Sequence, residues 1–194
     1  TGTNMDHLVP VKVADGVQAV AAGNFSLFLT SDRVLKGTGY NSYGQLGNGT
    51  TVHQQTPVVV SASVSAFTAG QQHVLFVKLD GTLWACGQNQ YGQLGDNTVA
   101  TKSTPVQVAT GVREVAAGTT FSLFLKADGS LWGMGRNEAG QLGRATTLTQ
   151  SNVPILIDSG VTGIAAAGST ALYVKNDGSL WGMGQNTAGN LGLG

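Results

Sequence analysis

The chain has 194 residues and no formal net charge, because 10 Lys and Arg balance 10 Asp and Glu. Charged residues make up 10% of the sequence, far below the usual share of about 25%, and the few cations are scattered singly. This pattern excludes the basic surface that attracts nucleic acid or an acidic membrane. No apolar run approaches the ~20 residues of a membrane span, so we expect no membrane insertion.

One segment recurs four times in register, beginning at a Leu and ending in Gly-x-Leu-Gly. The copies are Leu35–Gly47, Leu83–Gly95, Leu131–Gly143 and Leu180–Gly192. A period of about 48 residues is typical of propeller blades or solenoid repeats. We therefore expect one repeat array over residues 1–194, with units at approximately 1–47, 48–95, 96–143 and 144–194. If the array closes into a ring, the two termini can share one strand. The start at Thr1 rather than Met indicates a processed chain or part of a longer one.

Each unit begins with Pro followed by Val or Ile, and later reaches a triplet of small residues. Pro is compatible with an outer or edge strand, which needs no ladder donor there. The small triplets indicate a place where backbones crowd, as they do on the innermost strand of a propeller blade. These triplets are Ala21–Gly23, Thr68–Gly70, Ala116–Gly118 and Ala166–Gly168.

A short, mainly apolar run follows each triplet and predicts a strand buried on both faces. The runs are Phe25–Leu29, Val74–Val77, Phe121–Leu125 and Ala171–Val174. Three of them lead into Asp-Gly and then Leu-Trp, which predicts a tight hairpin with a type I′ turn. The Asn-x-x-Gly-x-Leu-Gly segment that comes next predicts a compact loop whose Leu tucks inward.

The first unit departs from this pattern. It has no turn glycine, and Lys36 stands where the other units have Trp84, Trp132 and Trp181. A Lys is costly in a dry interface between blades. We therefore expect the third strand of this unit to lie at an edge, at a seam or at a partner surface, with Lys36 as the candidate seam residue.

Together these motifs resemble the regulator-of-chromosome-condensation repeat family. The third copy carries the resemblance in Ala116–Gly118, Phe121–Leu125, Asp128–Gly133, Asn137 and Gly140–Gly143, with counterparts in the other copies. The resemblance implies an all-β fold, a β-propeller of four-stranded blades that usually number seven. Only four repeats are present here.

A four-blade arc should leave two apolar blade faces exposed. We hypothesise that two half-rings pair about a two-fold axis into an eight-bladed ring, a homodimer in which the tail of each chain meets the head of the other. Burying such faces contributes on the order of 10 kcal/mol. That is comparable with the entropy cost of association, ~4–15 kcal/mol.

No residues have the spacing of a catalytic, metal or cofactor site, so we expect a protein that is not an enzyme and needs no cofactor. The recurring Asp residues are explained by their turns. His7, His53 and His73 come singly, without another ligand at a metal-binding spacing. Cys86 stands alone within a strand and is expected to be a small buried apolar residue.

Positions that differ among the repeats are those that the scaffold does not dictate, so they are candidates for binding a partner. Tyr and Arg are favoured anchors in interfaces. The alternative is surface variation that the fold tolerates. The candidate residues are Tyr40, Tyr43, Gln90, Tyr91, Arg136 and Glu138.

The favoured interpretation is a non-catalytic scaffold for protein binding or self-assembly. Its low-charge blades, rich in Ser, Thr and Gly, resemble those of bacterial exported and cell-surface members of the family. One alternative is an inhibitor that clamps an enzyme with one propeller face. Another is guanine nucleotide exchange on a Ran-type GTPase, which in this family needs a protruding wedge and usually a basic tail. Neither feature is found in the sequence.

Overall fold

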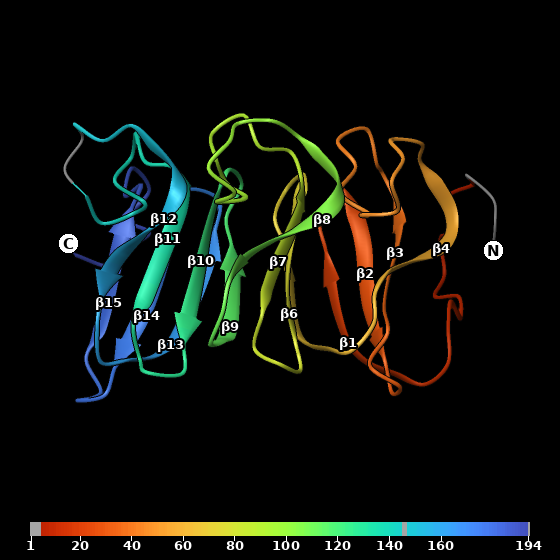
Figure 1. The fold of residues 1–194 in the computed structure, drawn as a ribbon, viewed down its shortest axis with the longest axis horizontal. Helices are drawn as coiled ribbons and strands as arrows, with labels where there is room; N and C mark the ends of the chain where they lie inside the picture. The colour runs from red at the N-terminus through yellow and green to blue at the C-terminus, as the bar shows by residue number, and fades with distance from the viewer. Residues whose placement is uncertain (1–4, 145–146, 194) are drawn as a thin grey trace.

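The computed structural model describes residues 5–144 and 147–193, which form an all-β chain of antiparallel sheets standing side by side (Figure 1). Three sheets have four strands and the last has three. The expected blade architecture is therefore confirmed, except that the fourth blade has no outer strand within the described ranges. In those ranges no helix is long and apolar enough to cross a membrane.

The strands follow one another in the same order in every sheet. The first sheet comprises β1 (Val17–Ala22), β2 (Phe25–Thr30), β3 (Leu35–Gly39) and β4 (Gln54–Ser61). The second comprises β5 (Val64–Ala69), β6 (His73–Lys78), β7 (Leu83–Gly87) and β8 (Lys102–Ala109). The third comprises β9 (Val112–Ala117), β10 (Phe121–Lys126), β11 (Leu131–Arg136) and β12 (Gln150–Asp158), and the fourth β13 (Val161–Ala167), β14 (Thr170–Lys175) and β15 (Leu180–Gly184). The segments that contain Pro57, Pro105 and Pro154 are thus the outer strands β4, β8 and β12, each closing the sheet that precedes it in the chain.

The predicted hairpins form, but the predicted type I′ turn is wrong. In the second sheet the amide of Gly81 donates to the carbonyl of Lys78 at 2.9 Å, and the amide of Lys78 donates to Thr82 at 2.9 Å. Gly81 has a φ of 78°, whereas Asp80 does not have a positive φ. This is a three-residue loop, a type I turn followed by one left-handed residue, so Gly is needed only at its last position. In the first sheet Arg33 takes that position with a φ of 64°.

The second strand forms the centre of the core in the first three blades, as its apolar run predicted, whereas in the fourth blade β14 is only partly buried and Val174 is exposed. In β6 and β10 every residue but the last is buried. Three of the four loop leucines are confirmed as inward plugs, because Leu46, Leu94 and Leu142 are fully buried; Leu191 in the fourth loop is half-buried. Cys86 is fully buried among apolar side chains, again as expected.

The inner strands approach one another closely at the small triplets. A Cβ atom added to Gly70 would lie 3.0 Å from the carbonyl oxygen of Gly118, and one added to Gly118 would lie 2.8 Å from that of Gly168. Such contacts are tighter than side chains tolerate, which explains the small residues. The predicted crowding of backbones on the inner strands is confirmed.

A repeated backbone hydrogen bond joins each sheet to the next. The amide of Val64, at the start of β5, donates to the carbonyl of Arg33 in the hairpin of the first sheet at 3.0 Å. Val112 donates in the same way to Gly81, and Val161 to Gly129, both at 2.9 Å. The geometry between neighbouring sheets is therefore nearly the same at all three internal boundaries.

Candidate binding surfaces

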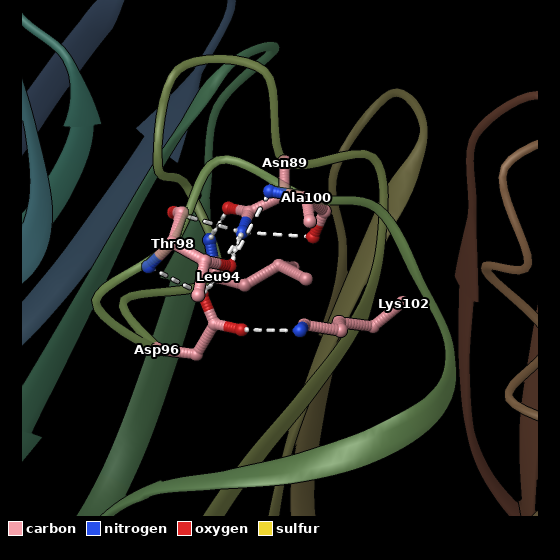
Figure 2. A network of polar contacts seen from close by, with 6 residues as sticks. All are labelled: Asn89, Leu94, Asp96, Thr98, Ala100 and Lys102. Atoms are coloured by element: carbon pink, nitrogen blue, oxygen red, sulfur yellow. Dashed lines mark hydrogen bonds and ion pairs between the residues drawn. The ribbon is translucent and has the colours of Figure 1, made fainter.

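The loops that follow the third strands lie together at one end of the sheets (top of Figure 1). Each is held by an Asn side chain, which is buried in the first three loops and exposed, as Asn186, in the fourth. In the second sheet Asn89 accepts a hydrogen bond from the amide of Leu94 at 2.9 Å and donates to the carbonyls of Thr98 and Ala100 at 3.1 Å (Figure 2). The matching amide bonds run from Leu46 to Asn41, from Leu142 to Asn137 and from Leu191 to Asn186.

An ion pair supports the same loop from below. Lys102 of β8 lies 3.2 Å from a carboxylate oxygen of Asp96, whose other oxygen accepts hydrogen bonds from Asn89 and Thr98 (Figure 2). Burial by itself raises the pKa of Asp96, but the hydrogen bonds from Thr98, Lys102 and Asn89 outweigh it, so the pKa lies below its ordinary value. The loop therefore presents its outer residues from a rigid base.

The candidate residues of the first sheet form one aromatic cluster. The ring of Tyr40 lies 6.4 Å from that of Tyr43 and stacks on the imidazole of His53 at 4.7 Å between centroids. The Nδ1 atom of His53 accepts a hydrogen bond from the amide of Asn41 at 2.9 Å, which fixes the ring. Both tyrosines are half-buried and His53 is exposed.

A second cluster crosses the boundary between the second and third sheets. The guanidinium of Arg136 lies 5.0 Å from the ring centroid of Tyr91 and forms an ion pair with Glu138. The hydrogen bond with Glu138 raises the pKa of Arg136, so the cation persists at any physiological pH. Gln90, the remaining candidate, is exposed next to Tyr91 in the chain.

Lys36 lies half-buried on β3, where it pairs with Phe28 on one side and Val59 on the other. Since β3 is hydrogen-bonded to both β2 and β4, it is not an edge strand. The sequence allowed the third strand to lie at an edge, at a seam or at a partner surface, and the structure excludes the edge. The role of Lys36 at a seam stays a prediction.

The two ends of the arc expose apolar side chains that are buried at the same repeat positions inside it. Leu180 in β15 is 66% exposed, whereas Leu35, Leu83 and Leu131 are fully buried. At the opposite end Val17 in β1 is 38% exposed, whereas Val64, Val112 and Val161 are buried at the same repeat position. The four repeats predicted two exposed apolar faces without naming these residues, although an alignment of the repeats position by position identifies them as the apolar positions of the terminal sheets.

A segment without strand partners lies beside β1. Residues 5–16 are exposed and belong to no strand. With Val17 and Val20 of β1, Val11 and Val13 of this segment line a hollow of about 420 Å³. The residues that line the hollow are mostly apolar.

The described residues form no cluster of metal-binding side chains, and two of the reactive side chains, His73 and Cys86, lie inside the protein. Within the described ranges no three His, Cys, Asp or Glu side chains come together as a metal site would require. His73 and Cys86 are fully buried, and burial lowers the pKa of His73 to about 4 and raises that of Cys86 to about 12. Neither lies on the loop-bearing surface with the tyrosines.

Comparison with known protein families gives a match over most of the chain. The model described as "Regulator of chromosome condensation (RCC1) repeat" matches residues 37–77, 80–125 and 128–174, and a second model with the same description matches residues 64–93 and 112–141. No curated protein sequence matches the chain.

Several solved structures have a similar fold. Human WBSCR16 is 28% identical, with a TM-score of 0.78 over 87% of this chain and 47% of that one. Prp20p from Saccharomyces cerevisiae, described together with its binding properties to Gsp1p and histones, is 23% identical, with a TM-score of 0.84 over 96% of this chain and 49% of that one. Yeast RCC1 (Prp20) bound to Kap60 is 22% identical, with a TM-score of 0.80 over 92% and 46%. The chain thus spans about half the length of these relatives.

Proposed function

Because the chain belongs to the regulator of chromosome condensation (RCC1) repeat family, we propose that it is a non-catalytic β-propeller scaffold that binds another protein with its loop-bearing end. The observation that carries this proposal is the cluster of Tyr91, Arg136 and Glu138, contributed by two adjacent sheets. These residues differ between repeats, whereas the buried Asn and Leu residues that hold the loops recur. The fold therefore does not require them.

Two properties of this cluster, and one likeness of the fold, support protein recognition. Tyr and Arg contribute large contact areas and are enriched among the residues that dominate interface energies. Their loops are fixed by buried hydrogen bonds, so little ordering entropy is lost on binding. The likeness to yeast RCC1 (Prp20), which is bound to Kap60 in its solved structure, supports protein binding by such a scaffold.

Affinity capture followed by remeasurement with the purified partner tests this proposal. The combined substitution Tyr91→Ala and Arg136→Ala should weaken binding by roughly 30-fold or more, the effect of losing an interface anchor. Gln107→Ala, on the exposed outer strand β8, is the matched control and should leave the affinity unchanged. Equal affinities for all three proteins would refute binding at this surface. Loss of the partner's own enzymatic activity on binding would identify the chain as an inhibitor.

A separate observation favours self-association. Leu180 and Val17, at opposite ends of the arc, expose apolar surface that the internal boundaries bury at equivalent positions. We propose that the chain pairs with a second copy about a two-fold axis, so that eight sheets close into one ring. Light scattering coupled to size exclusion should give about twice the chain mass of 19.8 kDa. A single-chain mass would refute the pairing and leave the proposal for the loop surface untouched.

A further inference from the structure

The outer edge of the fourth sheet is open. The third strands β3, β7 and β11 each pair with a strand on both sides, but β15 pairs only with β14 among the residues that the structure describes. An edge strand of this kind presents a row of backbone donors and acceptors, and such a row is a template for another strand.

We propose that residues 7–14 of a second copy add to β15 as its missing outer strand; this rests on the proposed self-association and gives it a register. In the three complete sheets the residue after Pro lies opposite the small residue at the centre of the third strand. These pairs are Val58 with Gly37, Val106 with Ala85 and Ile155 with Gly133. The equivalent pair joins Val11 to Gly182 of the other copy.

The side chains of the segment alternate as an outer strand requires. Val13 is 63% exposed in its own chain, but its counterpart Val60 is 7% exposed, and Val60, Val108 and Ile157 all pack with the blade cores. Lys12 corresponds instead to the outward positions of Val59, Gln107 and Leu156, all of which are exposed. In the proposed register Val13 enters the fourth blade and Lys12 stays in water.

The contacts that join neighbouring sheets inside the protein also have unfilled counterparts at its two ends. At the internal boundaries the hairpin carbonyls accept from the first amide of the next sheet, as Gly129 does from Val161 at 2.9 Å. The corresponding atoms at the two ends are the carbonyl of Gly178 and the amide of Val17. A Cβ atom on Gly118 would meet the Gly168 carbonyl at 2.8 Å, whereas one on Gly168 would meet nothing within 4 Å. A second copy in this arrangement supplies both contacts.

The chain's own segment does not fill this place. The N-terminal segment and β15 lie at opposite ends of the row of sheets (Figure 1). Closing that gap within one chain would require the sheets to leave the internal packing geometry that repeats at three boundaries. Two copies related by a two-fold axis can pair both open ends while they keep the internal packing geometry, because each seam is the same head-to-tail contact.

Matched substitutions test the strand addition. Val13→Asp places a carboxylate where the inward Val would be buried, so it should raise the dissociation constant of the dimer by at least about 100-fold. Lys12→Asp introduces the same residue one position away, facing water, and should change it less than about 5-fold. Since both side chains are exposed in the single chain, circular dichroism should show the wild-type fold for both variants.

Cysteine pairs test the register. Trp84 lies opposite Gln107 and Trp132 opposite Leu156, so Trp181 of one copy should lie opposite Lys12 of the other. Mixing a Lys12→Cys chain with a separately tagged Trp181→Cys chain under mild oxidation should give a disulfide-linked heterodimer. Val13→Cys, whose side chain points to the opposite face of the strand, should give at least about ten-fold less product.

Each outcome decides a different point. A two-chain mass that Val13→Asp abolishes and Lys12→Asp retains, together with the 12–181 cross-link, is the expected result. A two-chain mass that survives Val13→Asp, without the cross-link, overturns the strand addition but retains self-association. A single-chain mass for the wild-type protein overturns both and leaves the β15 edge to a different protein segment.

Discussion

The imidazole of His73 in β6 is joined to the hydroxyl of Ser122 in β10, with Nε2 and Oγ 2.9 Å apart, across the boundary between the second and third sheets. The Ser122 hydroxyl donates its own proton to the carbonyl of Gln93 at 2.7 Å, so it accepts from Nε2. His73 therefore carries a proton on Nε2, and because burial lowers its pKa to about 4 the ring is neutral near pH 7. Its Nδ1 atom is buried and has no hydrogen-bond partner among the described residues.

Acidification should destabilise the protein through His73. Burial lowers the pKa of His73 from 6.5 to about 4 in the folded chain. Between these values the unfolded chain binds a proton that the folded chain does not, so the free energy of unfolding falls as the pH falls. The full contribution is present above pH 6.5, and about 3 kcal/mol should be lost by pH 4. Urea unfolding at fixed protein concentration across this range measures the effect.

His73→Phe should remove this part of the pH dependence. Phe25 and Phe121 occupy the same repeat position, each opposite a Gly of the third strand, so the fold accommodates the ring. An unaltered slope between pH 6.5 and 4 in His73→Phe would show that other groups cause it.

Arg33→Gly should stabilise the protein by about 1 kcal/mol. Arg33 has a φ of 64° at the hairpin position where the other repeats have Gly81, Gly129 and Gly178. Its side chain is exposed, so the substitution removes little packing. Arg33→Ala keeps the unfavourable left-handed backbone and should give no gain. Thermal or urea unfolding measures the stability of both variants. A loss of stability in Arg33→Gly would contradict the backbone strain that we assign to Arg33.

Asn89→Ala should cost about 2–4 kcal/mol of unfolding free energy, since it leaves the amide of Leu94 and the carbonyls of Thr98 and Ala100 without their partner. The same substitution at Asn186 is the control. Asn186 makes the matching hydrogen bond with the amide of Leu191, at 2.8 Å, but it is exposed. Because water can replace this bond, we expect a loss of unfolding free energy below about 1 kcal/mol. Equal losses at the two positions would show that burial of the network does not matter.

Cys86 should resist thiol reagents in the folded protein. Its side chain is fully buried, its pKa is raised to about 12 by burial, and its Sγ lies 3.4 Å from the carbonyl of Gln45. The thiolate that reacts is therefore nearly absent at pH 8. Labelling should be complete in denaturant and at least about 100-fold slower without it. Rapid labelling under native conditions would reveal opening of the second blade.

Much of the fold was predictable because each blade repeats a local pattern. The inward plugs Leu46, Leu94 and Leu142 follow from their spacing after the apolar strand, and burial of β6 and β10 follows from their uninterrupted apolar runs. The turn type was predicted wrongly because Asp-Gly suits more than one loop, and the number of loop residues, rather than the dipeptide, decides whether Asp80 needs a positive φ.

The candidate surface was predicted only in part. Sequence variation among repeats identified Tyr91 and Arg136 separately, but their contact at 5.0 Å depends on how the second and third sheets pack. His53 was considered only as a metal ligand, and its stacking on Tyr40 at 4.7 Å comes from the path of a loop between two strands. Neither contact has a signature in sequence spacing.

The sequence by itself determined the repeat, the order of strands and hairpins, the inward Leu of the loops and the small residues of the inner strands, because these depend on patterns within one repeat or on its recurrence. The tertiary structure alone decided that β3 is not an edge strand, because the pairing with β4 spans a long loop. It also decided that His73 meets Ser122, and that Leu180 and Val17 are exposed while their counterparts are buried. These last features depend on packing between neighbouring sheets, which brings together residues about one repeat apart in sequence.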